Sequence, residues 1–142
     1  MRRNLTKPEN LHPWSRAIGL RTTRIERGKI WGELPYDERL IGDLETGGVH
    51  GGIIFTFLDN LSGKSCTATM KEYRAVATLD LRIDHMRPAE RNQTILGKAE
   101  CYRVAKSVAF TRAWAYHETQ DRLIAVAQGA FAITKLRTDI PT

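Results

Sequence analysis

Segment 46–59 contains most of the side chains of this sequence that could do chemistry. Glycine pairs stand on both sides of His50, and Asp59 follows nine residues after that histidine. Glycines let a backbone approach a ligand closely, and the first N–H groups of a helix lack intrahelical acceptors and carry the positive end of its dipole. Such N–H groups can polarise a carbonyl or stabilise an oxyanion. A helix that starts at these glycines would therefore carry a site for a carbonyl substrate.

Asp59 is the second candidate, because it interrupts a stretch that is otherwise apolar. A carboxylate in such a place costs free energy unless it is paired or functional. The spacing alone supports a catalytic carboxylate and a structural partner of a buried arginine equally well. His50 taken by itself is more often a hydrogen-bonded structural histidine than a base, and glycine pairs are the weakest signal because they occur in many turns.

Other motifs exclude several classes of site. Gly63-Lys64-Ser65 ends like a phosphate-binding loop, but Leu58 stands where that motif requires glycine, so we reject nucleotide binding. The chain has no G-x-S-x-G, H-E-x-x-H or G-x-G-x-x-G motif. The two cysteines, Cys66 and Cys101, are far apart in sequence and form no C-x-x-C motif, so we expect both to be buried and reduced and predict no metal site.

A long helix must position these groups. From Val49 the sequence reads VHGGIIFTFLDNLSGKSCTATM, apolar nearly all round until Asp59, which predicts a buried helix over about 50–69. Before it we expect a short helix after Pro13, two short strands or a hairpin over 21–36 that break at Gly28, and a loop over 37–48.

A sheet follows the long helix. Leu79, Leu81 and Ile83 alternate with polar residues, which predicts a strand that ends before Pro88. Three more strands are expected at about 93–105, 107–118 and 122–135, and their short connections predict antiparallel pairing. One face of these strands is rich in small residues: Gly97, Ala99, Cys101, Ala109, Thr111, Ala113, Ala115, Ala125, Ala127 and Gly129.

Small side chains allow a sheet to curve closely around a thick object, and the only such object is the long helix. We therefore predict an α+β fold in which one long central helix is wrapped by a curved antiparallel sheet of five to six strands. The 142 residues fit a single domain, with an N-terminal arm and short helix over 1–20 and a tail over 136–142.

Composition and charge narrow the class of partner. The chain has a net charge of +6, which first indicates nucleic acid. Residues 1–29 hold eight basic and two acidic side chains, so the rest of the chain is neutral, and the basic arm lacks interleaved aromatic residues. We therefore expect no nucleic-acid partner. No apolar stretch approaches the roughly 20 residues of a membrane span, so we expect no membrane partner and a cytoplasmic location.

Three segments together carry a resemblance to a known family. The run TGGVHGGIIFTFLDNLSG, the strand ATLDLRIDHMRPA and the strand end RVAKSVAF resemble the PaaI-like branch of the hotdog-fold acyl-CoA thioesterases, within the 4-hydroxybenzoyl-CoA thioesterase superfamily. The likeness covers roughly residues 35–135. It implies a hotdog fold, in which a curved sheet wraps a central helix, as the residues predict independently.

The resemblance also implies roles for particular residues. The N–H of Gly51, beside Gly52, would polarise the thioester carbonyl, while His50 helps to orient the site. Asp59 would act as nucleophile or as general base on water, across a dimer interface, and Thr78 would assist it. Many relatives carry an asparagine at the position of Leu44, where it helps to position the water that attacks the thioester. We therefore expect this water to be positioned differently here.

The leading hypothesis is an acyl-CoA thioesterase that works as a homodimer with shared active sites, two of which form a tetramer. It needs no cofactor beyond the coenzyme A of the substrate, although acyl carrier protein is an alternative carrier. Phosphate groups of coenzyme A require cations, and the candidates are Arg87, Arg91, Arg103 and Lys106. Two alternatives stay open: a hotdog hydratase or dehydratase, and a non-catalytic acyl-CoA-binding module. For the acyl group, Phe55, Phe57, Leu61 and Met86 could line a pocket or belong to the core.

Overall fold

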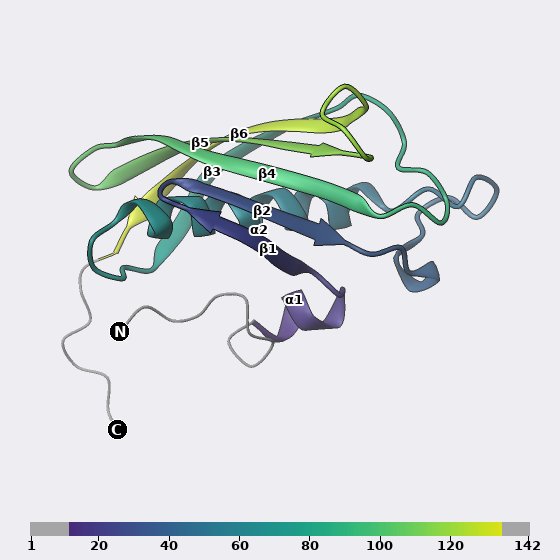
Figure 1. Cartoon of the computed structure of the whole chain (residues 1–142), viewed down its shortest axis with the longest axis horizontal. Coiled ribbons are helices and arrows are strands. Elements are labelled where there is room, and N and C mark those ends of the chain that lie inside the picture. The colour runs from purple at the N-terminus through teal and green to yellow at the C-terminus, as the bar shows by residue number, and fades with distance from the viewer. Residues whose placement is uncertain (1–11, 135–142) are drawn as a thin grey trace.

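The long helix α2 (Gly51–Thr69) runs along one face of a six-stranded sheet in the computed structural model, which describes residues 12–134 (Figure 1). The remaining elements are the short helix α1 (Pro13–Ala17), β1 (Arg21–Glu26), β2 (Lys29–Leu34), the 3-10 turn η2 (Glu38–Leu40), β3 (Val76–His85), β4 (Ile95–Val104), β5 (Val108–Tyr116) and β6 (Leu123–Ile133). Each predicted helix and strand is present. The expected N-terminal arm falls largely on residues 1–11, and the expected tail on 136–142, both outside the described residues.

The sheet is antiparallel throughout, in the order β1-β2-β4-β5-β6-β3. The β1–β2 hairpin turns at Gly28, whose φ of +72° suits a residue without a Cβ. β4, β5 and β6 form the predicted meander, whereas β3 pairs with β6 and lies at the sheet edge farthest from β1. This order places β3 beside the helix face that carries Asp59.

Small residues explain how the sheet curves onto α2. Gly32 of β2 lies directly opposite Gly97 of β4, and the rings and methyl groups of Phe57 and Leu61 pack into the hollow that these two glycines leave. Further along the same face, six small side chains are almost fully buried: Ala99, Ala109, Ala113, Ala115, Ala125 and Ala127. The predicted role of the small residues is therefore confirmed, and Phe57 and Leu61 belong to the core.

Gly97→Ala is expected to lower the free energy of unfolding by about 1–3 kcal/mol through overpacking. The new Cβ would lie 2.6 Å from Cδ1 of Leu61 and 2.7 Å from the ring of Phe57, and both side chains are fully buried and cannot move aside. Gly63→Ala on α2 is the matched control, because its Cβ would meet neighbours only at 3.5 Å and 3.7 Å. That change should stabilise the helix by up to about 1 kcal/mol. Urea unfolding of both variants measures the difference, and equal stabilities would refute this account of the packing.

The two cysteines lie together although 35 positions separate them in sequence. Both are free: Cys66 on α2 is buried, but Cys101 on β4 is only half-buried, so its expected burial was wrong. The hydrogen bond between the thiols lowers the pKa of Cys101 to about 6 and raises the pKa of Cys66. Among the residues that the structure describes, no helix is long and apolar enough to cross a membrane.

Candidate functional site

The start of α2 is built around His50, which is its N-cap residue. Nδ1 of His50 accepts a hydrogen bond of 2.9 Å from the Gly52 N–H, so the proton of the neutral ring is on Nε2. The backbone N–H of His50 donates to the Leu40 carbonyl at 2.8 Å. Gly42 lies against this turn, where a Cβ would come within 2.8 Å of the His50 Cα. His50 therefore holds the helix start in place, which agrees with an orienting role.

Gly51 is the first residue of α2, and its N–H has no acceptor within residues 12–134. The N–H groups of the first turn point out of the helix along its dipole, toward negative charge. Because the neighbouring Gly52 N–H is bonded to His50, the Gly51 N–H is the backbone donor that remains available to a ligand. This geometry suits the polarisation of a carbonyl group.

Asp59 lies two turns further along α2, where it faces β3. The hydroxyl of Thr78 donates to Oδ1 of Asp59 at 2.7 Å. Asp59 is half-buried, and among the described residues no cation forms an ion pair with it. The structural alternative, in which Asp59 pairs with a buried arginine, is therefore wrong for this part of the chain. One oxygen of the carboxylate is oriented by Thr78, and the other is free to act on a substrate.

Sequence reasoning missed a histidine beside the helix start. His85 ends β3 on the inner face of the sheet, next in the alternation after Leu81 and Ile83, which pack on the core. A Cβ built on Gly51 would lie 3.5 Å from Cε1 and 3.7 Å from Nε2 of His85. The alternation of the strand could have placed His85 on the helix side, but nothing in the sequence showed that Gly51 lies opposite.

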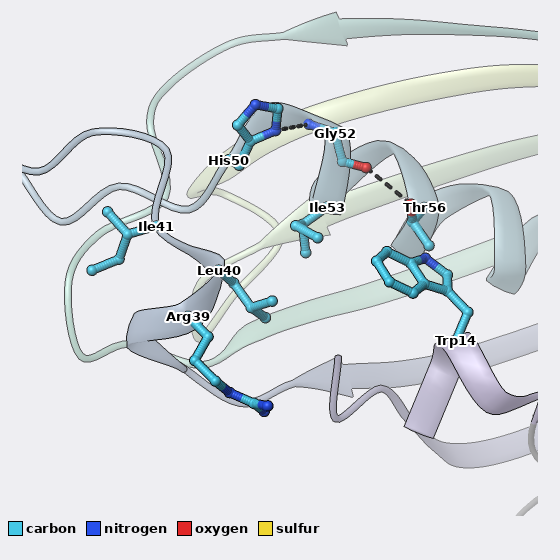
Figure 2. Close-up of a pocket in the computed structure, with 8 residues that line it drawn as sticks. All are labelled: Trp14, Arg39, Leu40, Ile41, His50, Gly52, Ile53 and Thr56. Carbon is cyan, nitrogen blue, oxygen red and sulfur yellow. Dashed lines mark hydrogen bonds between the residues drawn. The ribbon is translucent and has the colours of Figure 1, made fainter. Parts of the chain in front are cut away.

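Sequence reasoning also missed a cavity of about 420 Å³ beside the first turns of α2 (Figure 2). Its lining comes from three segments: Trp14 of α1; Arg39, Leu40 and Ile41 of the loop that precedes α2; and His50, Gly52, Ile53 and Thr56 of the helix start. An Asn60 side chain that donates to Ser15 at 3.1 Å ties α1 to α2. Phe55 and Met86, two of the predicted pocket residues, lie outside this lining and are exposed.

The four candidate cations fall into two groups. Arg87 and Arg91 follow β3, whose last residue contacts the helix start. Both side chains are exposed, and Arg91 folds over the loop before α2, donates to the Leu44 carbonyl at 3.4 Å and packs on Gly47. Arg103 and Lys106 lie around the β4–β5 turn, at the end of the sheet near the C-terminus of α2. Within one chain, only the first pair is near the Gly51 N–H.

Within residues 12–134, no three His, Cys, Asp or Glu side chains are grouped as a metal ion requires. The groups that the site presents are one backbone donor, one oriented carboxylate and two imidazoles. This set suits acyl transfer from an activated carbonyl compound.

Comparisons with known proteins agree with this chemistry. The model of the thioesterase superfamily matches residues 46–124, more than half of the chain. The medium/long-chain acyl-CoA thioesterase YigI of Escherichia coli K12 is 26% identical over 123 residues, which cover 76% of this chain and 77% of that protein. Human acyl-coenzyme A thioesterase 13 is 29% identical over 122 residues, 85% of this chain and 83% of that protein.

Solved structures show the same fold. A crystal structure of a Pseudomonas aeruginosa protein has a TM-score of 0.76 and 39% identity and covers 84% of this chain and 88% of its own. The PaaI protein of E. coli has a TM-score of 0.79 at 17% identity, with 89% and 87% covered, and so shows the fold alone. The resemblance found in the sequence and the hotdog architecture are both confirmed. The chain belongs to the thioesterase superfamily.

Proposed function

We propose that this protein hydrolyses acyl-CoA thioesters to a free acid and coenzyme A. The proposal rests on two groups of the buried helix α2. The Gly51 N–H at its start has no acceptor within residues 12–134, and Thr78 orients the carboxylate of Asp59. The relatives named as acyl-CoA thioesterases support the substrate class. A thioester is already activated toward acyl transfer, so one polarising donor and one placed carboxylate are sufficient.

In the proposed reaction the thioester carbonyl oxygen binds at the Gly51 N–H. Asp59 then removes a proton from a water molecule that attacks the carbonyl carbon, or attacks that carbon itself to form an anhydride that water cleaves. In both routes the C–S bond breaks and coenzyme A leaves as the thiolate. His50 keeps the helix start in the conformation that presents the Gly51 N–H.

One chain cannot complete this site. Asp59 lies eight helical positions after Gly51, a rise of about 12 Å, which is too far for its carboxylate to reach a carbonyl held at the start of the same helix. We therefore propose that the Asp59 of one subunit acts on a thioester bound at the Gly51 of its partner. Two active sites per dimer then follow from the two-fold symmetry.

The edge strand β3 is the surface we propose for this dimer. It is ten residues long, and within residues 12–134 no strand pairs with its outer edge. Leu79 and Met86, within and just after β3, each expose 60% of their surface, which a second copy would cover. The opposite edge strand, β1, is shorter and is interrupted by an irregularity at Thr22–Arg24. A tetramer made of two such dimers stays a prediction.

The substrate carrier and the location follow from the same features. Arg87, exposed near the helix start, is the best placed cation for the phosphates of coenzyme A, and Gly52 and Arg91 shape the turn beside it. Arg103 and Lys106 would contact coenzyme A only where the dimer places them beside the active site of the partner subunit. The adjacent free cysteines Cys66 and Cys101 fit a reducing compartment, so a cytoplasmic location is also proposed.

A panel of aryl, short-chain, medium-chain and long-chain acyl-CoA compounds tests the proposal, with release of the free thiol as the readout. We expect CoA release from at least one class, and no hydration of crotonyl-CoA. Hydration of crotonyl-CoA without thiol release would instead identify a hydratase. Tight binding of acyl-CoA without either reaction would identify a binding module.

A further inference from the structure

An oxyanion site works best with two converging donors, and the backbone of this chain provides one. The Gly52 N–H, the natural second donor, is bonded to Nδ1 of His50 at 2.9 Å. The remaining ring nitrogen of His50 is on the far side of the ring from Gly52 (Figure 2). A carbonyl oxygen at the Gly51 N–H would therefore have a vacant second position for a hydrogen bond.

The side chain nearest to a Cβ built on Gly51 is His85. Its Nε2 is 3.7 Å and its Cε1 is 3.5 Å from the place where a Gly51 Cβ would stand. In an α-helix the Cα–Cβ bond tilts toward the N-terminus, the direction in which the free N–H groups also point. The imidazole of His85 and the Gly51 N–H thus border the same space in front of the helix.

The hydrogen bonds of the histidines separate structural from available imidazoles. His117 is fully buried, and both of its ring nitrogens are bonded, to the Glu90 N–H and to the Thr94 carbonyl, each at 3.0 Å. His50 has one bonded nitrogen. Within residues 12–134 the exposed ring of His85 makes no hydrogen bond, so it does not have the structural role of His117.

We infer that His85 is a second oxyanion donor, whose ring N–H and the Gly51 N–H together bind the thioester carbonyl oxygen. The inference rests on the proposed acyl-CoA thioesterase function and adds a catalytic residue to it. As the tetrahedral intermediate forms, negative charge develops on this oxygen, and both hydrogen bonds strengthen. His85 keeps its proton throughout, because it donates a hydrogen bond and transfers nothing.

The test compares His85→Phe, which keeps a planar ring but removes the donor, with His85→Gln, which restores an N–H donor at a similar reach. Loss of one oxyanion donor predicts a kcat for His85→Phe that is about 10²- to 10³-fold lower with little change in KM, and a substantial recovery in His85→Gln. Asp84→Asn, on the opposite face of the same strand, is the matched control and should keep the wild-type kcat. An unchanged kcat in His85→Phe, or a His85→Gln variant as slow as His85→Phe, would overturn the inference.

A second readout does not depend on turnover. Benzoyl-CoA bound to the Asp59→Asn protein should show a carbonyl stretching frequency below that of free benzoyl-CoA, because the two donors polarise the bond. Adding His85→Phe should remove part of this shift, and adding His85→Gln should return it. The same carbonyl frequency in all three proteins would contradict the role of His85. A frequency shift that depends on His85, together with no acyl-CoA hydrolysis by the parent protein that retains Asp59, would refute the proposed function alone.

Discussion

Asp59→Asn is expected to lower kcat for acyl-CoA hydrolysis by about 10²- to 10⁴-fold, the range usual for a positioned general base. Asparagine has the size of aspartate and can still accept the 2.7 Å hydrogen bond from Thr78, so the local geometry should survive. It can neither take a proton from water nor form an anhydride. The loss should therefore appear in kcat, while the KM for acyl-CoA changes little.

Asp80→Asn is the control for this substitution. Asp80 is an exposed carboxylate of β3, paired in register with Ala130 on the outer face, and has no contact with Asp59. The Asp80→Asn variant should hydrolyse acyl-CoA at the wild-type rate. The midpoint of thermal unfolding should be similar for both variants and the parent. A folded Asp59→Asn protein with full activity would show that the helix carboxylate is not catalytic.

Gly51→Pro is expected to reduce kcat by about 10²- to 10³-fold, the effect of removing one oxyanion donor. Proline has no N–H, and the first helical position is where helices tolerate it best. His50, the preceding residue, has φ −57° and ψ 132°, the extended conformation that a following proline requires. Similar thermal unfolding of Gly51→Pro and the parent would show that the start of α2 is intact, and full activity in such a folded variant would contradict the role of the Gly51 N–H.

Mixing the two inactive variants tests whether the active site is shared. Random reassociation of equal amounts of Asp59→Asn and Gly51→Pro makes half of the dimers mixed, and each mixed dimer has one site with both defects and one intact site. About one quarter of the wild-type activity should return. Recovery of no activity, with mixed dimers demonstrated by mass, would mean that Asp59 acts within its own chain.

Residue periodicity was enough to predict the secondary structure of this protein. The long run after Val49, apolar on all sides, predicted α2, because a helix buried on all sides needs apolar residues all round. The alternation around Leu81 predicted β3, because a strand buried on one face needs an apolar residue at every second position. The small residues of the later strands predicted the curvature of the sheet, since only side chains such as Ala113 and Ala127 leave room for α2. Strand order was not predictable in this way. β3 precedes β4 in sequence but pairs with β6, and such long-range pairing depends on the packing of the whole sheet.

The chemical groups of the site were also visible in sequence, but their relations were not. His50, Gly51 and Asp59 share one helix, so the local sequence fixes their spacing, and the resemblance to a family supplied their roles. The bond from Thr78 to Asp59, the approach of His85 to Gly51 and the cavity beside Trp14 join segments that are far apart in the chain.

By itself, then, the sequence determined a central helix with a donor at its start and a carboxylate two turns on, because a helix converts residue spacing directly into distance. Only the tertiary structure decided which strand faces that helix, which of the two first glycines keeps a free N–H, and that His85 stands beside it. Contacts between distant segments arise from the packing of complete elements against one another, and the spacing of residues within one element does not specify them.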